Sequence, residues 1–402
     1  MAMDPSYPFL PGQIGPLQLR NRVIKAGTFE GMSPDGLVAD GLVQHHSAVA
    51  RGGVGLTTVA YCAVARDGLT FPHQLWMRDA VEPGLRRLTG SVHEAGAKVA
   101  LQLGHAGDFA SPGATGTRPR GPSARFNLFT FSRAAAADER TIRTWVQAFA
   151  DGAARAVACG FDAVELHFGH GYLISQFLSP WTNRRDDAWG GDDERRRRLA
   201  REVLQAVRAV LGQRAAILIK MNLEDGFPGG AGVEQAIGLA RACEELGADA
   251  LVLSGGFVSK TPFYMLRGEL PVREMVRNEE RWHRRAGLTL FGRLVVPQHP
   301  YHDLFFLDLA RQVRPHVSLP LVLLGGVRSL VQMRQAGEEG FDFVSLGRPL
   351  IQDEALINKL QRGELEASPC EPCNRCVAEM ERHGIRCTHP EHGQPDTSRR
   401  AR

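Results

Sequence analysis

The chain contains 402 residues, of which 43% are hydrophobic and 23% charged, and this composition predicts a globular protein of one large domain or two ordinary ones. The formal net charge is only +4, and lysine and arginine are spread along the chain, so no nucleic-acid partner is indicated. No apolar stretch is long enough to cross a membrane, and the N-terminus lacks the pattern of an export signal. We therefore expect a cytoplasmic protein without a membrane or nucleic-acid partner.

A short phrase recurs along the chain, as GFDAVEL at 160–166, GADALVL at 247–253 and GFDFVSL at 340–346. In each copy a glycine ends an amphipathic helix, an aspartate turns the chain and an apolar run follows, which is typical of a helix leading into a buried strand. Buried strands are predicted near residues 22–28, 55–62, 98–104, 162–167, 216–222, 250–254, 321–325 and 343–347. Helices are predicted at 38–51, 81–96, 139–159, 193–211, 232–246, 303–314, 328–338 and 352–362.

Eight alternations of strand and helix predict a (β/α)8 fold, the TIM barrel, over residues 1–362. An open doubly wound sheet is the competing fold. Its usual nucleotide-binding sequence G-x-G-x-x-G is absent after the first strand, which favours the barrel. Residues 363–402 are expected to form a Cys-rich C-terminal extension and tail.

The active site of such a barrel lies at the C-terminal ends of its strands. In chain order the residues at these ends include Ala26, Gly27 and Thr28, then Tyr61, Gln102, the group His167, His170 and Tyr172, then Lys220, Asn222, Ser254, Gly325, Gly326, Gly347 and Arg348. Glycines at the last two strand ends, together with an arginine, are typical of a phosphate-binding site. An ordinary turn with a solvated arginine is the alternative.

Two imidazoles and a phenol follow the fourth strand, at His167, His170 and Tyr172. Such a group can hold a carbonyl oxygen and transfer a proton, so we predict that these residues bind substrate and catalyse its reaction. The two histidines can instead be structural, or they can bind zinc in a barrel hydrolase. The hydrolase interpretation is weak because the other strand ends offer no matching acidic ligands.

The connection after the sixth strand, from residue 256 to about 300, is long for a barrel loop and contains Phe263, Tyr264, Met265 and Trp282. A connection of this length at the catalytic end usually forms a lid or a pocket wall. We expect it to set substrate preference, with Tyr264 as a substrate contact. Its arginines are interspersed with acidic residues, which favours a solvated helix over a site for an anionic substrate.

Four of the seven cysteines are spaced C-x2-C-x2-C-x10-C, at Cys370, Cys373, Cys376 and Cys387. In a reducing compartment this grouping predicts a metal site rather than disulfides. Further candidate zinc ligands nearby are His383, His389 and His392. An iron-sulfur cluster, a structural zinc and metal-free thiols are the three interpretations.

Several longer motifs point to a known family: NRVIKA at 21–26, GGVGL at 52–56, QLGHAG at 102–107, HFGHGYLISQFLSPWTNRRDDAWGG at 167–191, LLGGV at 323–327 and LGRPLI at 346–351. Through them the chain resembles the Old Yellow Enzyme family of FMN-dependent NAD(P)H oxidoreductases over residues 8 to about 362. The resemblance implies bound FMN, NADH or NADPH as hydride donor, and ping-pong reduction of the C=C bond of a small α,β-unsaturated carbonyl or related compound. It also implies a homo-oligomer.

The resemblance assigns roles to individual residues. The implied FMN contacts are Ala26, Gly27, Thr28, Tyr61, Gln102, Lys220, Gly325, Gly326, Gly347 and Arg348, the last four at the phosphate. Gln102 would bind the pyrimidine edge of the flavin, and Lys220 stands beside N1 and O2 where the family usually has arginine. Phe29 departs from the pattern, since many relatives have cysteine or threonine near flavin O4 at this position.

For the substrate, the resemblance implies that His167 and His170 bind the carbonyl or nitro oxygen and that Tyr172 donates the proton. The cysteine stretch is similar to the cluster-binding stretch of bacterial dienoyl-CoA reductases and trimethylamine dehydrogenases, larger relatives with a [4Fe-4S] centre. Their additional flavin- and nucleotide-binding domains have no counterpart in these 402 residues. An alternative function is therefore an iron-sulfur flavoprotein dehydrogenase or electron-transfer subunit that works with a partner protein.

Overall fold

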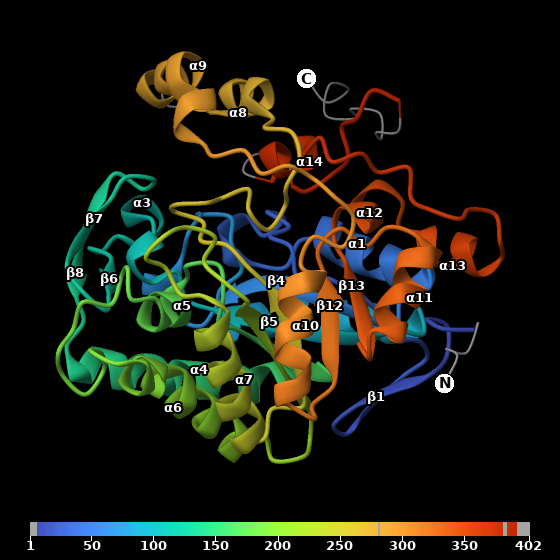
Figure 1. The fold of residues 1–402 in the computed structure, drawn as a ribbon, viewed down its shortest axis with the longest axis horizontal. Coiled ribbons are helices and arrows are strands. Elements are labelled where there is room, and N and C mark those ends of the chain that lie inside the picture. The colour runs from blue at the N-terminus through green and yellow to red at the C-terminus, as the bar shows by residue number, and fades with distance from the viewer. Residues whose placement is uncertain (1–5, 280–281, 381–383, 392–402) are drawn as a thin grey trace.

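The computed structural model describes residues 6–279, 282–380 and 384–391, and its centre is a closed barrel of parallel strands (Figure 1). The barrel strands are β3 (Val23–Lys25), β4 (Leu56–Ala63), β5 (Lys98–Gly104), β9 (Ala163–His167), β10 (Ala216–Asn222), β11 (Ala250–Ser254), β12 (Leu321–Leu324) and β13 (Phe343–Leu346). Each strand pairs in parallel with the next in this order, and β13 pairs with β3 to close the barrel. The predicted (β/α)8 barrel and its eight strands are confirmed.

Helices cover the outside of the barrel and connect successive strands (Figure 1). They are α1 (Asp40–Arg51), α2 (Glu82–Glu94), α4 (Glu139–Ala158), α6 (Asp193–Leu211), α7 (Val233–Glu245), α10 (Leu307–Val313), α11 (Leu330–Glu338), α12 (Arg348–Gln352) and α13 (Leu356–Gln361). The single helix predicted over 352–362 was wrong at its start. Asp353 has an extended backbone (φ −141°, ψ 102°), so two short helices flank it.

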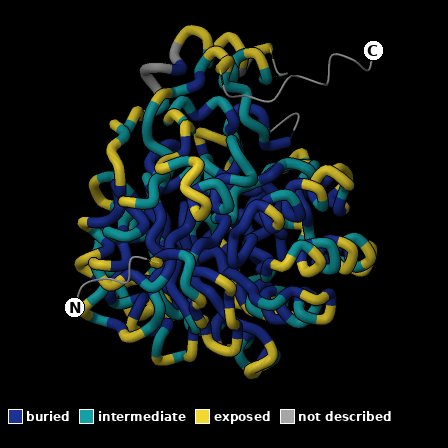
Figure 2. Tube along the Cα trace, turned by 90° about the vertical axis from the view of Figure 1, so that its right-hand side faces the viewer, coloured by how far each residue is buried: buried dark blue, intermediate teal, exposed yellow. Residues whose placement is uncertain are grey.

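The core lies in the barrel and between the barrel and its helices. All residues of β4, β9 and β11 are buried, which is expected for strands covered on both faces. Trp145 and Phe149 on one face of α4 are 2% and 1% exposed, and each such ring contributes roughly 2–3 kcal/mol through burial. Figure 2 shows this buried interior surrounded by exposed outer turns.

The register of β9 with its two neighbours positions the candidate site. Gln102 of β5 is paired with Glu165, and Lys220 of β10 is paired with His167. Because alternate residues of a strand face the same side, Glu165 and His167 both project into the barrel. β9 therefore supplies two layers of polar side chains, with His167 nearer the C-terminal end.

Several elements lie outside the repeating pattern, and of these only a helix in the long loop after the sixth strand was predicted. The additional strands are β1 (Gly12–Ile14), β2 (Leu17–Leu19), β6 (Arg120–Gly121), β7 (Arg125–Asn127) and β8 (Ser132–Ala136), and the additional helices are α3 (Pro112–Thr115), α5 (Leu173–Leu178), α8 (Val272–Asn278), α9 (Trp282–Val295) and α14 (Arg375–Glu379). Short 3-10 helices occur at Pro34–Gly36, Arg66–Gly68, Asp79–Val81, Gly107–Phe109 and Arg314–His316. β1 and β2 form a hairpin, and β6, β8 and β7 form a small separate sheet.

The long loop after β11 and the Cys-rich extension pack against each other. Figure 1 shows α8, α9 and α14 gathered on one side of the barrel. Arg277 of α8 forms an ion pair with Glu379 of α14 at 2.7 Å, and the amide of Asn278 donates to the carbonyl oxygen of Ala378 at 2.6 Å. The backbone N–H of Ile385 donates to the carbonyl oxygen of Glu30 at 2.7 Å. The extension is thus attached both to the loop and to the end of the first barrel strand.

Candidate active site

The predicted catalytic group is assembled at the end of β9. The ring centroids of His167 and His170 lie 4.9 Å apart, and those of His167 and Tyr172 lie 4.8 Å apart, both in edge-to-face geometry. Tyr61 joins the group, with its ring centroid 5.1 Å from that of Tyr172. Tyr61 thus lies beside the proposed proton donor, and its hydroxyl is hydrogen-bonded to that of Thr70.

The backbone of His170 has the left-handed conformation (φ 60°), which is unfavourable for a residue with a side chain. Three contacts hold it there. Its N–H donates to Asn222 Oδ1 at 2.9 Å, its carbonyl accepts from the N–H of Val258 at 2.9 Å, and its Nε2 lies 2.6 Å from Ser254 Oγ. The sequence analysis gave no role to Asn222 or Ser254, although both stand at predicted strand ends.

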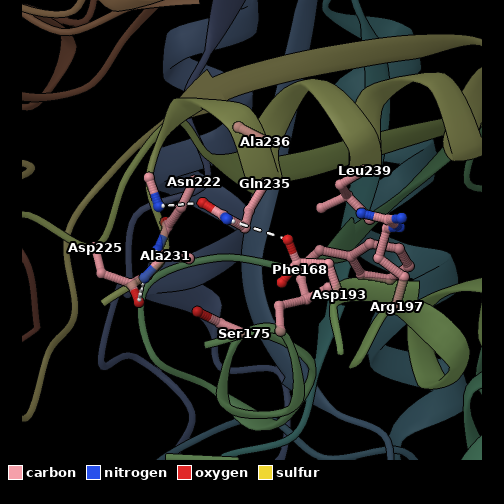
Figure 3. A pocket seen from close by; sticks show the side chains of 12 residues that line it. Phe168, Ser175, Asp193, Arg197, Asn222, Asp225, Ala231, Gln235, Ala236 and Leu239 are labelled. Atoms are coloured by element: carbon pink, nitrogen blue, oxygen red, sulfur yellow. Dashed lines mark hydrogen bonds between the residues drawn. The ribbon is translucent and has the colours of Figure 1, made fainter. Parts of the chain in front are cut away.

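Asn222 lines a pocket between α5, α6 and α7 (Figure 3) and is fixed in turn by hydrogen bonds. Its amide donates to Asp225 Oδ1 at 3.0 Å and to the carbonyl oxygen of Gly256 at 2.8 Å. Asp225 also accepts from the N–H of Ala231 at 2.8 Å. The orientation of His170 therefore depends on a hydrogen-bonded chain that continues to the outside of the barrel.

Burial keeps both histidines uncharged. It lowers the pKa of His170 to about 3 and that of His167 well below its ordinary value, and the Lys220 charge lowers both further. Burial raises the pKa of the Tyr172 phenol to about 12. At neutral pH the site therefore presents two neutral imidazoles and a protonated phenol.

A layer of polar side chains lies beneath this group. Gln102 Nε2 donates to Glu165 Oε1 at 2.5 Å, and Lys220 Nζ donates to the carbonyl oxygen of Gly27 at 3.0 Å. Lys220 Nζ also lies 3.6 Å from Glu165 Oε1. The predicted flavin contacts Gly27, Gln102 and Lys220 are thus brought together. Sequence reasoning missed Glu165, whose only signal was an acidic residue inside an apolar strand.

The ends of the first and last strands are adjacent, as the predicted flavin contacts require. The N–H of Ala26 donates to the carbonyl oxygen of Leu346 at 2.8 Å, and a Cβ added at Gly347 would lie 3.4 Å from the methyl group of Thr28. Thr28 Oγ1 is buried and has no hydrogen-bond partner within the described part of the chain. An unsatisfied hydroxyl here fits a bound polar ligand.

Gly325 and Gly326, after β12, have φ values of 98° and 82° that suit glycine alone. Arg348 donates to the carbonyl oxygens of Leu266 and Arg267 and, at 2.6 Å, to Asn374 Oδ1. Its guanidinium thus joins the barrel to the long loop and the extension. The phosphate role of these residues stays a prediction.

Tyr264 lies in the long loop, as expected, and its hydroxyl donates to Glu224. Its ring centroid is 5.0 Å from that of His299 and 5.9 Å from that of Phe306. A substrate contact at Tyr264 stays a prediction.

Phe29, which departs from the family pattern, stacks on Phe71 with ring centroids 5.0 Å apart.

The small sheet formed by β6, β7 and β8 also reaches the site, which the sequence analysis did not foresee. The ring of Phe129, in the β7–β8 turn, lies 5.1 Å from that of Phe109, and Phe109 lies 6.1 Å from Tyr172. Phe129 is 43% exposed. Phe109, in the 3-10 helix Gly107–Phe109, thus lies beside the phenol, and Phe129 from the small sheet packs on Phe109.

A second buried charge group lies at the first strand. Lys25 forms an ion pair with Glu30, whose other carboxylate oxygen accepts from the N–H of Ala60 at 2.9 Å. His46 Nε2 lies 3.5 Å from Glu30. Burial acts to raise the pKa of Glu30, but Lys25 and His46 outweigh it and lower this pKa to about 2, while burial lowers the pKa of His46 to about 3.

The four C-terminal cysteines are free thiols that line one cavity together with Arg348, Asn374 and His389. Burial raises the pKa of Cys370 to about 11 and that of Cys376 to about 12, against an opposing effect of Arg348. Within the described ranges, no three His, Cys, Asp or Glu side chains are arranged around a single ion. Of the alternative zinc ligands, His383 and His392 lie outside the described residues, and His389 is 3.3 Å from Glu371.

Residues 8–260 match the model of the NADH:flavin oxidoreductase / NADH oxidase family. The 4,4'-dithiodibutanoate disulfide reductase of Rhodococcus erythropolis is 40% identical over 380 residues, which is 94% of this chain and 94% of that protein. The NADH oxidase of Thermoanaerobacter brockii is 31% identical over 91% of this chain and 52% of that protein. This chain thus spans nearly all of one relative and about half the length of the other.

Solved structures agree on the fold. The Old Yellow Enzyme homologue from Zymomonas mobilis superposes with a TM-score of 0.73 at 22% identity, covering 96% of this chain and 98% of that chain. A 2-naphthoyl-CoA reductase superposes with a TM-score of 0.79 at 22% identity, covering 93% of this chain and 54% of that chain.

The barrel, the site and these matches define a flavin-dependent oxidoreductase. The chain belongs to the NADH:flavin oxidoreductase / NADH oxidase family, the family of the Old Yellow Enzymes. This confirms the resemblance on which the residue assignments were based. Among the described residues, no helix is both long and apolar enough to cross a membrane.

The buried histidines predict that stability falls as the pH is lowered from 7 to 5. His46, His167 and His170 stay neutral in the folded protein, whereas in the unfolded chain they bind protons below about pH 6.5. Because the unfolded state then binds more protons, His46 and His170 each lower the free energy of unfolding by about 2 kcal/mol at pH 5, and His167 acts in the same direction. The stability of the folded state is therefore unaffected by these histidines above about pH 6.5 and is lost progressively as the pH falls from 6.5 toward 3.

The measurement is thermal unfolding followed by circular dichroism at pH 5.0 to 7.5, with FMN at constant excess. A midpoint that does not move between pH 7 and pH 5 would contradict the assignment of neutral buried imidazoles.

Proposed function

We propose that this protein is an FMN-dependent NAD(P)H oxidoreductase that reduces the C=C bond of α,β-unsaturated carbonyl compounds. The observation that supports this best is the meeting of His167, His170 and Tyr172 above the layer formed by Gln102 and Lys220. The ring centroids of His170, the second hydrogen-bond donor for an oxygen, and of Tyr172, the proton donor, thus lie 4.9 and 4.8 Å from that of His167. This arrangement suits conjugate reduction, in which charge develops on a carbonyl oxygen while a carbon atom needs a proton.

The residues present fit an FMN molecule. The unsatisfied hydroxyl of Thr28, the amide of Gln102 and the ammonium of Lys220 suit the polar edge of the ring system. The positive φ values of Gly325 and Gly326, the space beside Gly347 and the cationic Arg348 support a phosphate site at the last two strand ends. FMN, when bound, supplies transfer of a hydride between the nicotinamide and the substrate.

The side chains of this chain would then act on the substrate itself. His167 and His170 hold the carbonyl oxygen by N–H donation. Their low pKa values keep them neutral, so they stabilise the charge that develops on this oxygen as neutral, buried hydrogen-bond donors. Ser254 engages one nitrogen of His170 and thereby orients the ring. Tyr172, protonated at neutral pH, delivers a proton to the α-carbon. Nicotinamide and substrate would occupy this pocket in turn.

The test of the proposal is spectroscopic. The purified protein should bind FMN, lose its yellow colour when NADH or NADPH is added without oxygen, and recover it when cyclohexenone is added. A protein that binds no FMN, or that bleaches and does not recover with any enone, would refute the proposed function. Turnover by the isolated chain would also argue against the alternative in which a partner protein completes the reaction.

Tyr172→Phe is predicted to slow reoxidation by cyclohexenone by at least about tenfold while changing flavin reduction by less than about threefold. The reason is that the phenol acts on the substrate carbon, and positioned proton donors typically contribute 10²–10⁴-fold, of which water can replace part. Stopped-flow measurement of the two half reactions gives both rates. Tyr7→Phe, at a buried tyrosine whose hydroxyl donates to the carbonyl oxygen of Phe341 at 3.2 Å, is the matched control. Equal slowing of both half reactions would contradict the acid role.

A second candidate function is reduction of organic disulfides, and it is favoured by the 40% identity to a 4,4'-dithiodibutanoate disulfide reductase. In that reaction a hydride and one sulfur form an S–H bond, and the S–S bond breaks with its electron pair leaving on the other sulfur. The leaving thiolate can take its proton from Tyr172 or from water. The same pocket can therefore accommodate either chemistry.

The two functions differ in their dependence on Tyr172. We expect Tyr172→Phe to slow enone reduction at least about tenfold but disulfide reduction less than about threefold. The reason is that a thiolate can leave without being protonated, whereas the α-carbon of the enone must receive a proton. The ratio of kcat/KM for cyclohexenone and for 4,4'-dithiodibutanoate, in the native protein and in the variant, measures this. Equal losses with both substrates would contradict the distinction.

We further propose that the four C-terminal cysteines bind a [4Fe-4S] cluster, with a structural zinc as the alternative. In support, all four thiols line one cavity, and their spacing along the chain is typical of metal ligands. A cluster here could pass electrons to a separate partner protein.

Protein purified without oxygen should contain about four iron atoms per chain and less than one zinc. Cys376→Ser, at a buried ligand position, should lose the iron, and Cys243→Ser, at a buried cysteine of α7, should keep it. Elemental analysis together with the absorbance beside the flavin bands measures both. One zinc per chain, or neither metal, would contradict the cluster.

A further inference from the structure

Glu165 lies inside the barrel between two predicted flavin contacts, and no role in the chemistry has been given to it. It is the third residue of β9, is 1% exposed, and is paired in register with Gln102 of β5. Lys220, on the other neighbouring strand, is 2% exposed. Burying a carboxylate costs several kcal/mol unless its oxygens accept hydrogen bonds or pair with a cation. The partners of Glu165 therefore indicate its role.

The first partner fixes the orientation of an amide. Glu165 Oε1 accepts a hydrogen bond from Gln102 Nε2 at 2.5 Å. Because a carboxylate accepts but does not donate, the NH2 group of Gln102 must face Glu165. The amide oxygen of Gln102 is then the group presented on the remaining side, where it can accept a hydrogen bond. With a neutral amide in place of Glu165, both orientations of Gln102 would find a partner.

The second partner is a cation. Lys220 Nζ lies 3.6 Å from Glu165 Oε1 and donates to the carbonyl oxygen of Gly27 at 3.0 Å. A Cβ added at Gly27 would lie 2.8 Å from Gln102 Nε2 and 3.1 Å from Glu165 Oε1, so the four groups converge at one place. Glu165 therefore both holds the ammonium of Lys220 and offsets part of its charge.

We propose that Glu165 is a positioning residue that presents Gln102 as a hydrogen-bond acceptor and restrains the charge of Lys220 at the flavin pyrimidine edge. The inference rests on the FMN binding of the proposed function. The pyrimidine edge carries an N–H donor flanked by carbonyl oxygens, so an amide fixed as an acceptor, next to a cation, complements it. Reduction of the flavin adds negative charge at this edge, and Glu165 opposes that charge through its own.

The two roles predict separate effects. Glu165→Gln removes the negative charge and frees the orientation of Gln102. Because the charge is lost, the variant should bind reduced FMN about tenfold more tightly relative to oxidised FMN. This corresponds to a midpoint potential about 30 mV higher for a two-electron couple. Loss of the fixed amide should weaken binding of oxidised FMN by about tenfold. A purely structural role would weaken both redox forms equally and leave the potential unchanged.

The experiment measures FMN dissociation constants by flavin fluorescence and midpoint potentials by dye equilibration, in the full chain. Glu165→Gln, Gln102→Leu and the double variant form a cycle, and the double variant should lose little more affinity than Gln102→Leu alone. The control is Glu30→Gln, an equally buried acid that is bonded to Lys25 and the N–H of Ala60 instead. Its effect on affinity should add to that of Gln102→Leu within about twofold.

Glu165→Asp keeps the charge but shortens the side chain. The ratio of its affinities for reduced and oxidised FMN should therefore stay within about twofold of the native ratio, which is about 9 mV in midpoint potential, while FMN affinity is still lost. This variant tests the proposal even where Glu165→Gln does not fold. If the native protein binds no FMN, the proposed function fails. If the native protein binds FMN but the cycle is additive, or Glu165→Gln leaves the potential unchanged, the role of Glu165 is overturned and the proposed function stands.

Discussion

The pairing of β9 with β5 on one side and β10 on the other is the constraint on which the site depends. A shift of either register by one residue would turn Gln102 or Lys220 away from the barrel interior and separate it from Glu165 and His167. Closure of the barrel makes such a shift costly, because β9 cannot slide without breaking the pairing of its neighbours. Rigid strands thus place polar groups to within a hydrogen-bond length, while the loops that follow add His170 and Tyr172.

The chemistry of the site follows from removing these groups from water. An imidazole in solution would be partly charged near neutral pH, whereas His167 and His170 are held neutral by burial and by Lys220. The same burial costs stability, as do the left-handed backbone of His170 and the buried charges of Lys25 and Glu30. Strained and desolvated groups concentrated at one end of a barrel are expected where a protein exchanges stability for function.

The sequence predicted those parts of the molecule that carry a repeating signal or a local cluster. Eight apolar runs separated by helical periods determined the barrel, and the close spacing of His167, His170 and Tyr172 located the reactive end. Glu165 gave no such signal, because one acid in a buried strand cannot be distinguished by spacing from an outward-facing residue. The partners of Arg348 and the approach of Phe129 to Phe109 were also beyond prediction, since both depend on how long irregular loops fold back over the barrel.

Asn374 ties together three parts of the molecule that are distant in sequence. It is 1% exposed and left-handed (φ 56°), its amide donates to the carbonyl oxygens of Arg267 and Glu269 at 2.9 Å each, and its oxygen accepts from Arg348. Shortening the gene after codon 362 would therefore not yield a self-sufficient catalytic core. It would remove the Asn374 donor from the carbonyl oxygen of Glu269 and one of the three acceptors of the Arg348 guanidinium, so expression of the barrel alone is an unsuitable strategy for crystallisation or assay.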